Sequence, residues 1–200
     1  MSVPVIVIPG IGNSGPLHWQ SVWEKKNPDF QRVRQADWDR PVRSEWVDAI
    51  QQTAVTVRRP AVLVAHSLGC LAFAYWAVST RLPVAGALLV AVPDPTREQF
   101  PSAATGFTPV PVQRFDFPSI VVASSDDPYG SLEYVGRCAA AWGSRLVTIG
   151  PAGHINAASG LGDWQEGFAL LEELRAPPSS RAASGSSPSS GSSPRHRARD

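Results

Sequence analysis

Two kinds of hydrophobic pattern alternate along the chain. Short apolar runs rich in valine, typical of strands buried on both faces, are separated by longer stretches in which apolar residues recur at helical spacing. The predicted strands span residues 3–8, 30–35, 61–65, 84–92, 119–124 and 146–149. The predicted helices span residues 17–26, 44–57, 68–79, 131–142 and 161–175.

The order of these elements predicts the fold class. Strands that alternate with helices indicate a compact α/β domain, a parallel six-stranded sheet covered by helices on both faces, and we assign residues 1–175 to it. Binding sites in such sheets form beyond the carboxyl ends of the strands. The loops expected at that edge begin at Gly10, Ser67, Pro93, Asp126 and Gly150.

The chain passes from a predicted strand to a predicted helix within about one residue at Ser67. Small residues, Ala65 and Gly69, lie two positions before and two positions after it, as a tight corner requires. This pattern is typical of the G-x-S-x-G nucleophile elbow, which lifts a serine hydroxyl above the end of a parallel sheet, although alanine replaces the first glycine. The alternative interpretation is a serine that only caps the following helix.

A nucleophilic serine needs a histidine as general base. Of the four histidines, only His154 follows the last predicted strand, in a Gly-Pro-Ala-Gly loop at the expected edge. His66 precedes Ser67 on a strand, so its side chain is expected to point away from that of Ser67. His18 is expected to line the pocket or to pack against a neighbouring tryptophan.

The acid that orients the histidine is expected at the end of a later strand. Asp126 and Asp127 follow the fifth predicted strand, and Asp94 follows the fourth. We favour Asp127, because the following Pro128 restricts its backbone to extended conformations and so fixes the direction of its side chain. Asp126 is the second choice. The aspartate that does not hold the histidine is expected to bond to the backbone of Tyr129 or Gly130 in the following turn. The order Ser67, Asp127, His154 is the one this kind of fold uses.

An oxyanion hole requires two backbone N–H groups. Leu68, the residue after Ser67, is expected to supply the first. The second is expected from the glycine-rich loop 9–15, where we favour Ile11 over Gly12. A phosphate-binding turn is the weaker interpretation of this loop, because neither G-x-G-x-x-G nor G-K-[ST] occurs in it.

Composition narrows the function classes further. The formal net charge of the 200 residues is +1, which gives no reason to expect nucleic acid or a membrane surface as a partner. The apolar run at residues 3–8 is too short for a signal peptide or a membrane-spanning helix, so a cytoplasmic location is the default. Cys70 and Cys138 form no Cys/His cluster, and we expect no metal, no disulfide and no cofactor.

The chain changes character from residue 176 onwards. Residues 176–200 consist almost entirely of Ser, Pro, Ala, Gly and Arg. Such a segment cannot bury enough apolar surface to offset the entropy lost on ordering, so we predict a disordered tail. Its weakly basic end is expected to be solvated rather than to bind a partner.

Taken together, these motifs resemble the small serine hydrolases of the YdeN and retinoblastoma-binding-protein type, a compact branch of the α/β-hydrolases. The resemblance covers about residues 3–174. It is carried by Ile8-Pro9-Gly10, Asn13-Ser14-Gly15, His18-Trp19, Ala65-His66-Ser67-Leu68-Gly69, Ser125-Asp126-Asp127-Pro128 and Gly153-His154. It implies a six-stranded parallel sheet whose second strand lies outside the first, no large lid domain, and metal-free hydrolysis of acyl compounds, often short-chain esters.

The preferred hypothesis is therefore a serine hydrolase acting on esters or related acyl compounds. His154 would take the proton of Ser67, Asp127 would hold the imidazole, and the amides of Leu68 and Ile11 would bind the oxyanion. The alternatives are a thioesterase or peptidase on the same fold, and a non-catalytic protein-binding module on that fold. The sequence predicts a small acyl substrate but not its chain length, and it identifies no protein partner.

Overall fold

The computed structural model describes residues 2–177. The tail predicted at residues 176–200 lies almost entirely outside this range, so its disorder stays a prediction. None of the helices within residues 2–177 has the length and the apolar character that a membrane span requires.

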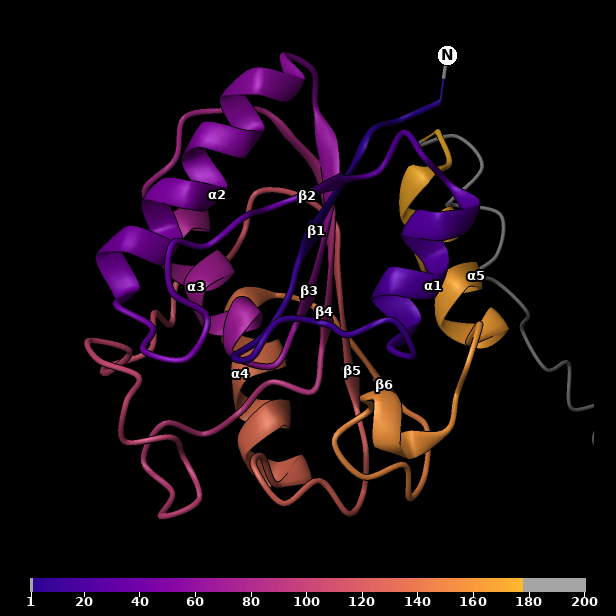
Figure 1. Cartoon of the computed structure of the whole chain (residues 1–200). Coiled ribbons are helices and arrows are strands. Elements are labelled where there is room, and N and C mark those ends of the chain that lie inside the picture. The colour runs from indigo at the N-terminus through magenta and orange to yellow at the C-terminus, as the bar shows by residue number, and fades with distance from the viewer. Residues whose placement is uncertain (1, 178–200) are drawn as a thin grey trace, which may run out of the picture.

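Six strands form one parallel sheet through the centre of the domain (Figure 1). They are β1 (Val5–Ile8), β2 (Gln31–Arg32), β3 (Ala61–His66), β4 (Val84–Val90), β5 (Ser119–Ala123) and β6 (Arg145–Thr148). The strand order is β2-β1-β3-β4-β5-β6, and every neighbouring pair runs parallel. The predicted α/β class is confirmed, and so is the outer position of the second strand that the family resemblance implied.

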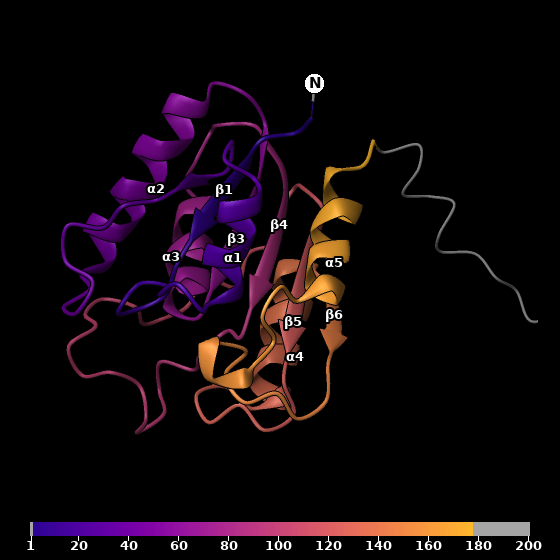
Figure 2. The ribbon, with the colours of Figure 1, turned by 45° about the vertical axis from the view of Figure 1, so that its right-hand side comes forward.

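Helices cover both faces of the sheet (Figures 1 and 2). On one face lie α2 (Arg43–Val57), α3 (Leu68–Ala77) and α4 (Leu132–Trp142). On the other face lie α1 (Trp19–Lys26) and α5 (Gln165–Arg175). A short 3₁₀ turn, η1 (Ala157–Ser159), precedes α5 at the carboxyl edge of the sheet.

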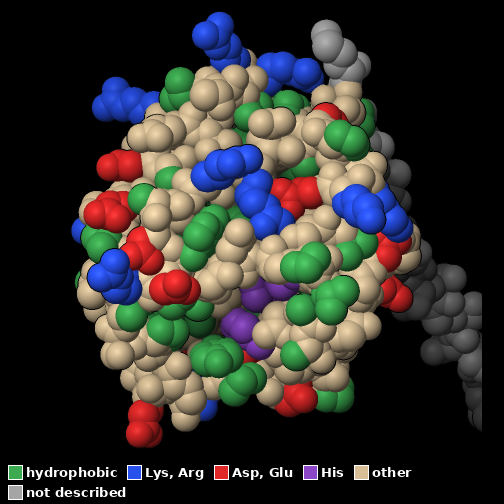
Figure 3. Space-filling model, viewed as in Figure 1, with side chains coloured by type: hydrophobic (Ala, Val, Ile, Leu, Met, Phe, Trp, Pro, Cys, Tyr) green, Lys and Arg blue, Asp and Glu red, His purple; other side chains and the backbone are tan. Residues whose placement is uncertain are grey.

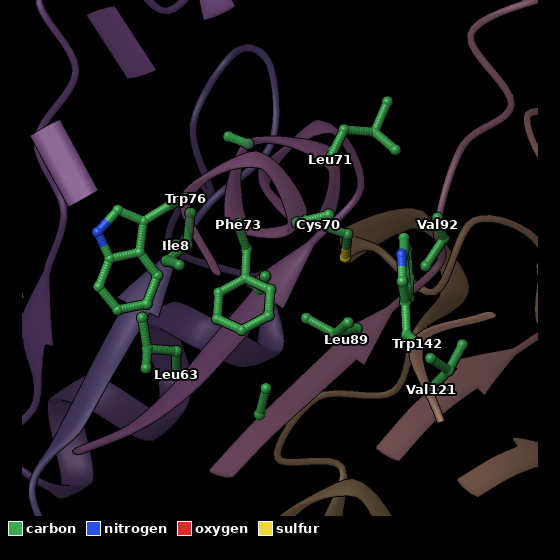
Figure 4. Packing of buried hydrophobic residues seen from close by; sticks show 14 of the residues in the cluster. Ile8, Leu63, Cys70, Leu71, Phe73, Trp76, Leu89, Val92, Val121 and Trp142 are labelled. Carbon is green, nitrogen blue, oxygen red and sulfur yellow. The ribbon is translucent and has the colours of Figure 1, made fainter. Parts of the chain in front are cut away.

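The central strands are apolar along most of their length because both of their faces are buried. Successive side chains of a strand point to opposite faces. In β3, Leu63 belongs to the cluster beneath α3, whereas Val62 and Val64 belong to the cluster beneath α1 and α5. Figure 4 shows Phe73 and Trp76 of α3 over the first of these surfaces. Each fully buried side chain of this kind contributes about 1.5–3 kcal/mol to folding.

The last helix begins later than its hydrophobic pattern predicts, at Gln165 rather than residue 161. Gly160, Gly162 and Trp164 have φ values of 65°, 54° and 37°, which lie outside the right-handed helical region. The second strand is likewise limited to Gln31–Arg32, at the edge of the sheet, where only one neighbour holds it. Neither change alters the loops at the carboxyl edge.

The strand-to-helix corner depends on contact between two stretches of backbone. A Cβ atom at Gly69, in the first turn of α3, would lie 2.6 Å from the carbonyl oxygen of Pro9 and 2.7 Å from that of Ile8. Real Cβ atoms do not approach backbone this closely, so any side chain at residue 69 would push α3 away from the end of β1. Glycine at this position therefore sets how closely α3 approaches the sheet.

We expect Gly69→Ala to lower the free energy of unfolding by about 1–3 kcal/mol, because the added methyl overlaps backbone atoms that cannot rotate away. Urea denaturation of the variant and the wild-type protein measures the difference. Gly15→Ala is the matched control, since a Cβ atom at Gly15 meets no other atom within 4 Å. Equal stability of the two variants would contradict the packing assigned to Gly69.

Candidate active site

Ser67 occupies the corner between β3 and α3 in a strained conformation. Its φ and ψ are 53° and −128°, a combination that non-glycine residues rarely adopt and that costs about 1–3 kcal/mol. Its side chain makes no capping hydrogen bond to the helix. Instead its hydroxyl oxygen, Oγ, lies 2.7 Å from Nε2 of His154. The structure therefore does not support the interpretation of Ser67 as a simple helix cap.

Asp127 holds the opposite side of the His154 ring. Nδ1 of His154 lies 2.9 Å from each carboxylate oxygen of Asp127, and the Asp127 side chain is only 2% exposed. One of these oxygens also accepts the backbone N–H of Tyr129 at 2.9 Å. Because a carboxylate accepts from Nδ1–H, the neutral His154 ring carries its proton on Nδ1, and its Nε2 faces the Ser67 hydroxyl as an acceptor.

The other two candidate aspartates have different partners. Asp126 is exposed and accepts hydrogen bonds from the Ser124 hydroxyl at 2.7 Å and the Gly153 N–H at 2.8 Å. The prediction that the spare aspartate bonds to the following turn is wrong: Asp127 bonds to that turn, and Asp126 holds the loop that carries His154. Asp94 accepts from the N–H and the hydroxyl of Thr96, and the carboxylate bonded to His154 is that of Asp127.

His66 lies in the pocket, contrary to the expectation that its side chain points away from Ser67. Its Nε2–H donates to the backbone carbonyl of His154 at 2.9 Å, and the two rings are 5.0 Å apart. The expectation assumed strand geometry, in which successive side chains alternate. The positive φ of Ser67 breaks that alternation, so both side chains reach the same pocket. Sequence pattern alone carries no signal of this.

His18 meets both expectations, since it lines the pocket and packs 5.1 Å from the ring of Trp19. Its Nδ1 accepts the N–H of Gln20 at 3.2 Å and so caps α1. Burial, followed by the positive charge of Arg32, lowers the pKa of His18 from 6.5 to about 4. Burial also holds the pKa of His66 well below its usual value. Both rings are therefore neutral at pH 7.

The glycine-rich loop passes directly beside Ser67. A Cβ atom at Gly10 would lie 2.9 Å from Cβ of Ser67. The Gly12 amide, the second choice for the oxyanion hole, already donates to the Trp38 carbonyl at 2.9 Å. Within residues 2–177, no hydrogen-bond acceptor pairs with the amides of Ile11 or Leu68, and both residues line the pocket. These two amides are free to donate to a substrate oxygen.

These groups surround a pocket of about 430 Å³ at the carboxyl edge of the sheet. Figure 3 shows histidine side chains at the floor of a hollow on this face. Among the described residues that line it, none is Lys, Arg, Asp or Glu. The residues that line the pocket are Gly10, Ile11, Asn13, Gly15, His18, His66, Ser67, Leu68, Pro93, Phe100, Pro101, Tyr129, His154, Asn156, Ala157 and Ala158.

The described residues contain no group of three or more His, Cys, Asp or Glu side chains placed to hold a metal ion. Cys70 and Cys138 are buried and free, and burial raises the pKa of both thiols. Neither cysteine lines the pocket, whereas Ser67, His66 and His154 do.

A parallel sheet of this strand order, with a serine at a strained strand-to-helix corner, defines the α/β-hydrolase class. A family model described as serine hydrolase matches residues 5–173. The chain therefore belongs to the serine hydrolase family. A search of curated protein sequences found no match.

Solved structures share this fold. A YdeN-like hydrolase from Pectobacterium atrosepticum is 33% identical, over 87% of this chain and 91% of that one, with a TM-score of 0.78. The ydeN gene product of Bacillus subtilis is 21% identical, over 86% and 98%, with a TM-score of 0.66. A thermophilic esterase from Thermogutta terrifontis is 16% identical, over 88% and 92%, with a TM-score of 0.63. The resemblance to the YdeN type is confirmed.

Mild acid is expected to destabilise the fold through the buried histidines. Because the folded pKa of His18 lies below its unfolded value, its contribution is complete above about pH 6.5 and is lost as pH falls towards 4. Between about pH 7.5 and pH 5, His18 alone should reduce the free energy of unfolding by about 2 kcal/mol, and His66 acts in the same direction.

Urea denaturation at both pH values tests this expectation. His18→Asn is the comparison variant, because asparagine keeps a capping acceptor for α1 but does not titrate. The variant should lose about 2 kcal/mol less than the wild-type protein on acidification. An identical loss in both proteins would contradict the assignment to His18.

Proposed function

We propose that this hydrolase is a serine esterase, which cleaves carboxylic esters through a covalent acyl-enzyme. The single observation that carries the proposal is the 2.7 Å contact between Oγ of Ser67 and Nε2 of His154, with the Asp127 carboxylate on the other ring nitrogen. Nucleophile, base and orienting acid are already within hydrogen-bond reach, as acyl transfer requires.

In the first half-reaction, Oγ of Ser67 attacks the ester carbonyl carbon while its proton passes to Nε2 of His154. The carbonyl oxygen becomes an oxyanion, which the amides of Leu68 and Ile11 stabilise. The tetrahedral intermediate then collapses, the bond to the leaving alcohol breaks, and His154 gives its proton to that oxygen. Asp127 keeps the ring oriented and stabilises its charged form.

In the second half-reaction, water attacks the acyl-enzyme. His154 takes a proton from the water, the same two amides hold the new oxyanion, and the bond to Ser67 breaks as the hydroxyl regains its proton. The products are the acid and the regenerated serine. Each donor of an oxyanion hole is worth about 10²–10³ in rate, because the donors are in place before charge develops.

The pocket favours a neutral substrate of modest size. Its volume is about 430 Å³, and apolar residues such as Ile11, Phe100 and Pro101 form much of its wall. An unpaired charge buried there would lose its hydration without gaining a partner. Ester cleavage needs only the serine, histidine, aspartate and two amides described above. The T. terrifontis neighbour, an esterase, has the same fold. Thioesters and amides are the competing substrate classes.

Ser67→Ala should abolish labelling by a fluorophosphonate probe and reduce hydrolysis of p-nitrophenyl butyrate by roughly 10⁴-fold or more, because within residues 2–177 only the Ser67 hydroxyl bonds to His154. Gel fluorescence and steady-state kinetics provide the two measurements. Persistent labelling of the variant would mean that another residue is the nucleophile. A wild-type protein that neither labels nor cleaves esters, thioesters or amides would support the protein-binding alternative.

Asp127→Asn should lower kcat by roughly 10³–10⁴-fold, because the amide cannot stabilise the charged imidazole and favours the wrong tautomer. Asp126→Asn is the matched control. Its Oδ1 can still accept the Gly153 N–H, so we expect less than about a tenfold change. Steady-state kinetics on one ester compares the two variants. The opposite ranking would show that Asp126 is the orienting acid.

A further inference from the structure

We propose that Gln20 and Ser14 act as positioning residues, which fix the oxyanion loop (residues 9–15) relative to Ser67. Gln20 lies outside the pocket lining and does not reach the reacting atoms. The inference rests on the proposed function, because it assigns these two side chains a part in stabilising the oxyanion. The two side chains are inferred to affect kcat rather than the binding of substrate.

Gln20 is completely buried, and its amide orientation is fixed by its partners. Its Nε2 donates to the backbone carbonyls of Ile8 at 3.3 Å and Val64 at 3.1 Å. Carbonyl oxygens only accept, so the NH₂ group must face them. The Gln20 Oε1 atom therefore faces the Ser14 hydroxyl, which donates to it at 2.6 Å. Ser14 is itself only 4% exposed.

These bonds join three parts of the site. Ile8 is the last residue of β1, and Val64 lies near the end of β3, the strand that leads into Ser67. Gln20 thus ties α1 to both strand ends, while the Ser14 hydroxyl ties the oxyanion loop to Gln20. Removing the Ser14 hydroxyl would break the bond that joins the far end of the loop to Gln20 and, through it, to the ends of β1 and β3, without changing a residue of the pocket lining.

Ser14 directly follows the turn that carries Ile11. The N–H of Asn13 donates to the Gly10 carbonyl at 3.1 Å, which closes a tight turn around Ile11 and Gly12. Ser14 is the residue that follows this turn. A glycine-rich loop loses much conformational entropy on ordering, so it needs such anchors to hold one conformation.

Two further bonds hold the backbone of Ser14 from the outside. Its carbonyl accepts from the hydroxyl of Ser21 at 2.7 Å and from the guanidinium of Arg32 at 3.0 Å. Arg32 also contacts the side chain of Asn13 at 2.7 Å. These contacts should keep the loop folded when the buried bond is lost, so the effect on rate can be measured on a folded protein.

An oxyanion donor works only when it lies about 2.7–3.1 Å from the developing charge. A small displacement of Ile11 would leave substrate binding nearly intact, because the ground-state carbonyl gains little from this bond. The same displacement would raise the energy of the transition state. Loss of the Gln20–Ser14 bond should therefore lower kcat and spare KM.

The test is Ser14→Ala, assayed with p-nitrophenyl butyrate and with two matched inhibitors. An alkyl trifluoromethyl ketone binds as an oxyanion formed with Ser67, whereas the corresponding methyl ketone remains largely a neutral ground-state ligand. We expect kcat to fall roughly tenfold and KM to change less than about twofold. The trifluoromethyl ketone should bind roughly tenfold more weakly, and affinity for the methyl ketone should not change.

Ser119→Ala is the matched control. The Ser119 hydroxyl is also buried and makes a 2.6 Å hydrogen bond with the Ser144 hydroxyl. It lies at the start of β5, at the amino ends of the strands and so away from Ser67. Its loss should leave kcat and both inhibitors unchanged. Ser14→Thr, which keeps a hydroxyl, should recover much of the lost rate.

Three outcomes would overturn the inference. Unchanged kcat and unchanged trifluoromethyl ketone affinity in Ser14→Ala would show that the bond does not position the loop. Equal weakening of both ketones together with a raised KM would show a general structural role. A wild-type protein without Ser67-dependent turnover would overturn the proposed function and this inference with it, a result that the first two outcomes do not produce.

Discussion

Close contact between backbone segments at the carboxyl edge of the sheet is the constraint on which the site depends. Gly69 lets the first turn of α3 touch the end of β1, and Gly10 lets the following loop pass beside Ser67. Because these segments touch, the strained conformation of Ser67 is held by its surroundings. Ser67 and the loop that carries Ile11 are therefore held side by side by backbone packing, as the proposed roles of both residues require.

Helix α1 connects this corner to the loop that carries the histidine. The indole N–H of Trp19 donates to the Ile155 carbonyl at 2.8 Å, and that of Trp23 donates to the Asp163 carbonyl at 2.6 Å. On the same helix, Gln20 bonds to the strand ends and to Ser14. One short helix thus bonds to both loops beside Ser67, through side chains that are buried against the sheet.

The charged and neutral groups around the pocket suit the proposed reaction, in which charge forms only in the transition state and intermediates. Burial keeps His18 and His66 neutral, and the buried carboxylate of Asp127 lies on the far side of His154. In the proposed reaction, a positive charge on His154 would have Asp127 as a close partner and no cationic neighbour among His18 and His66. Burial of the carboxylate strengthens that interaction, because little water remains to screen it.

The sequence by itself determined the strand and helix pattern, the serine at the corner and the loops that follow each strand, because these follow from local periodicity and turn chemistry. It also ranked Asp127 above Asp126 from the proline that follows, and the structure places Asp127 beside His154. Only the tertiary structure decided the entry of His66 into the pocket, the partners of Asp126 and the burial of Gln20. Those depend on which backbone groups remain unpaired once distant segments meet, and no local pattern records that.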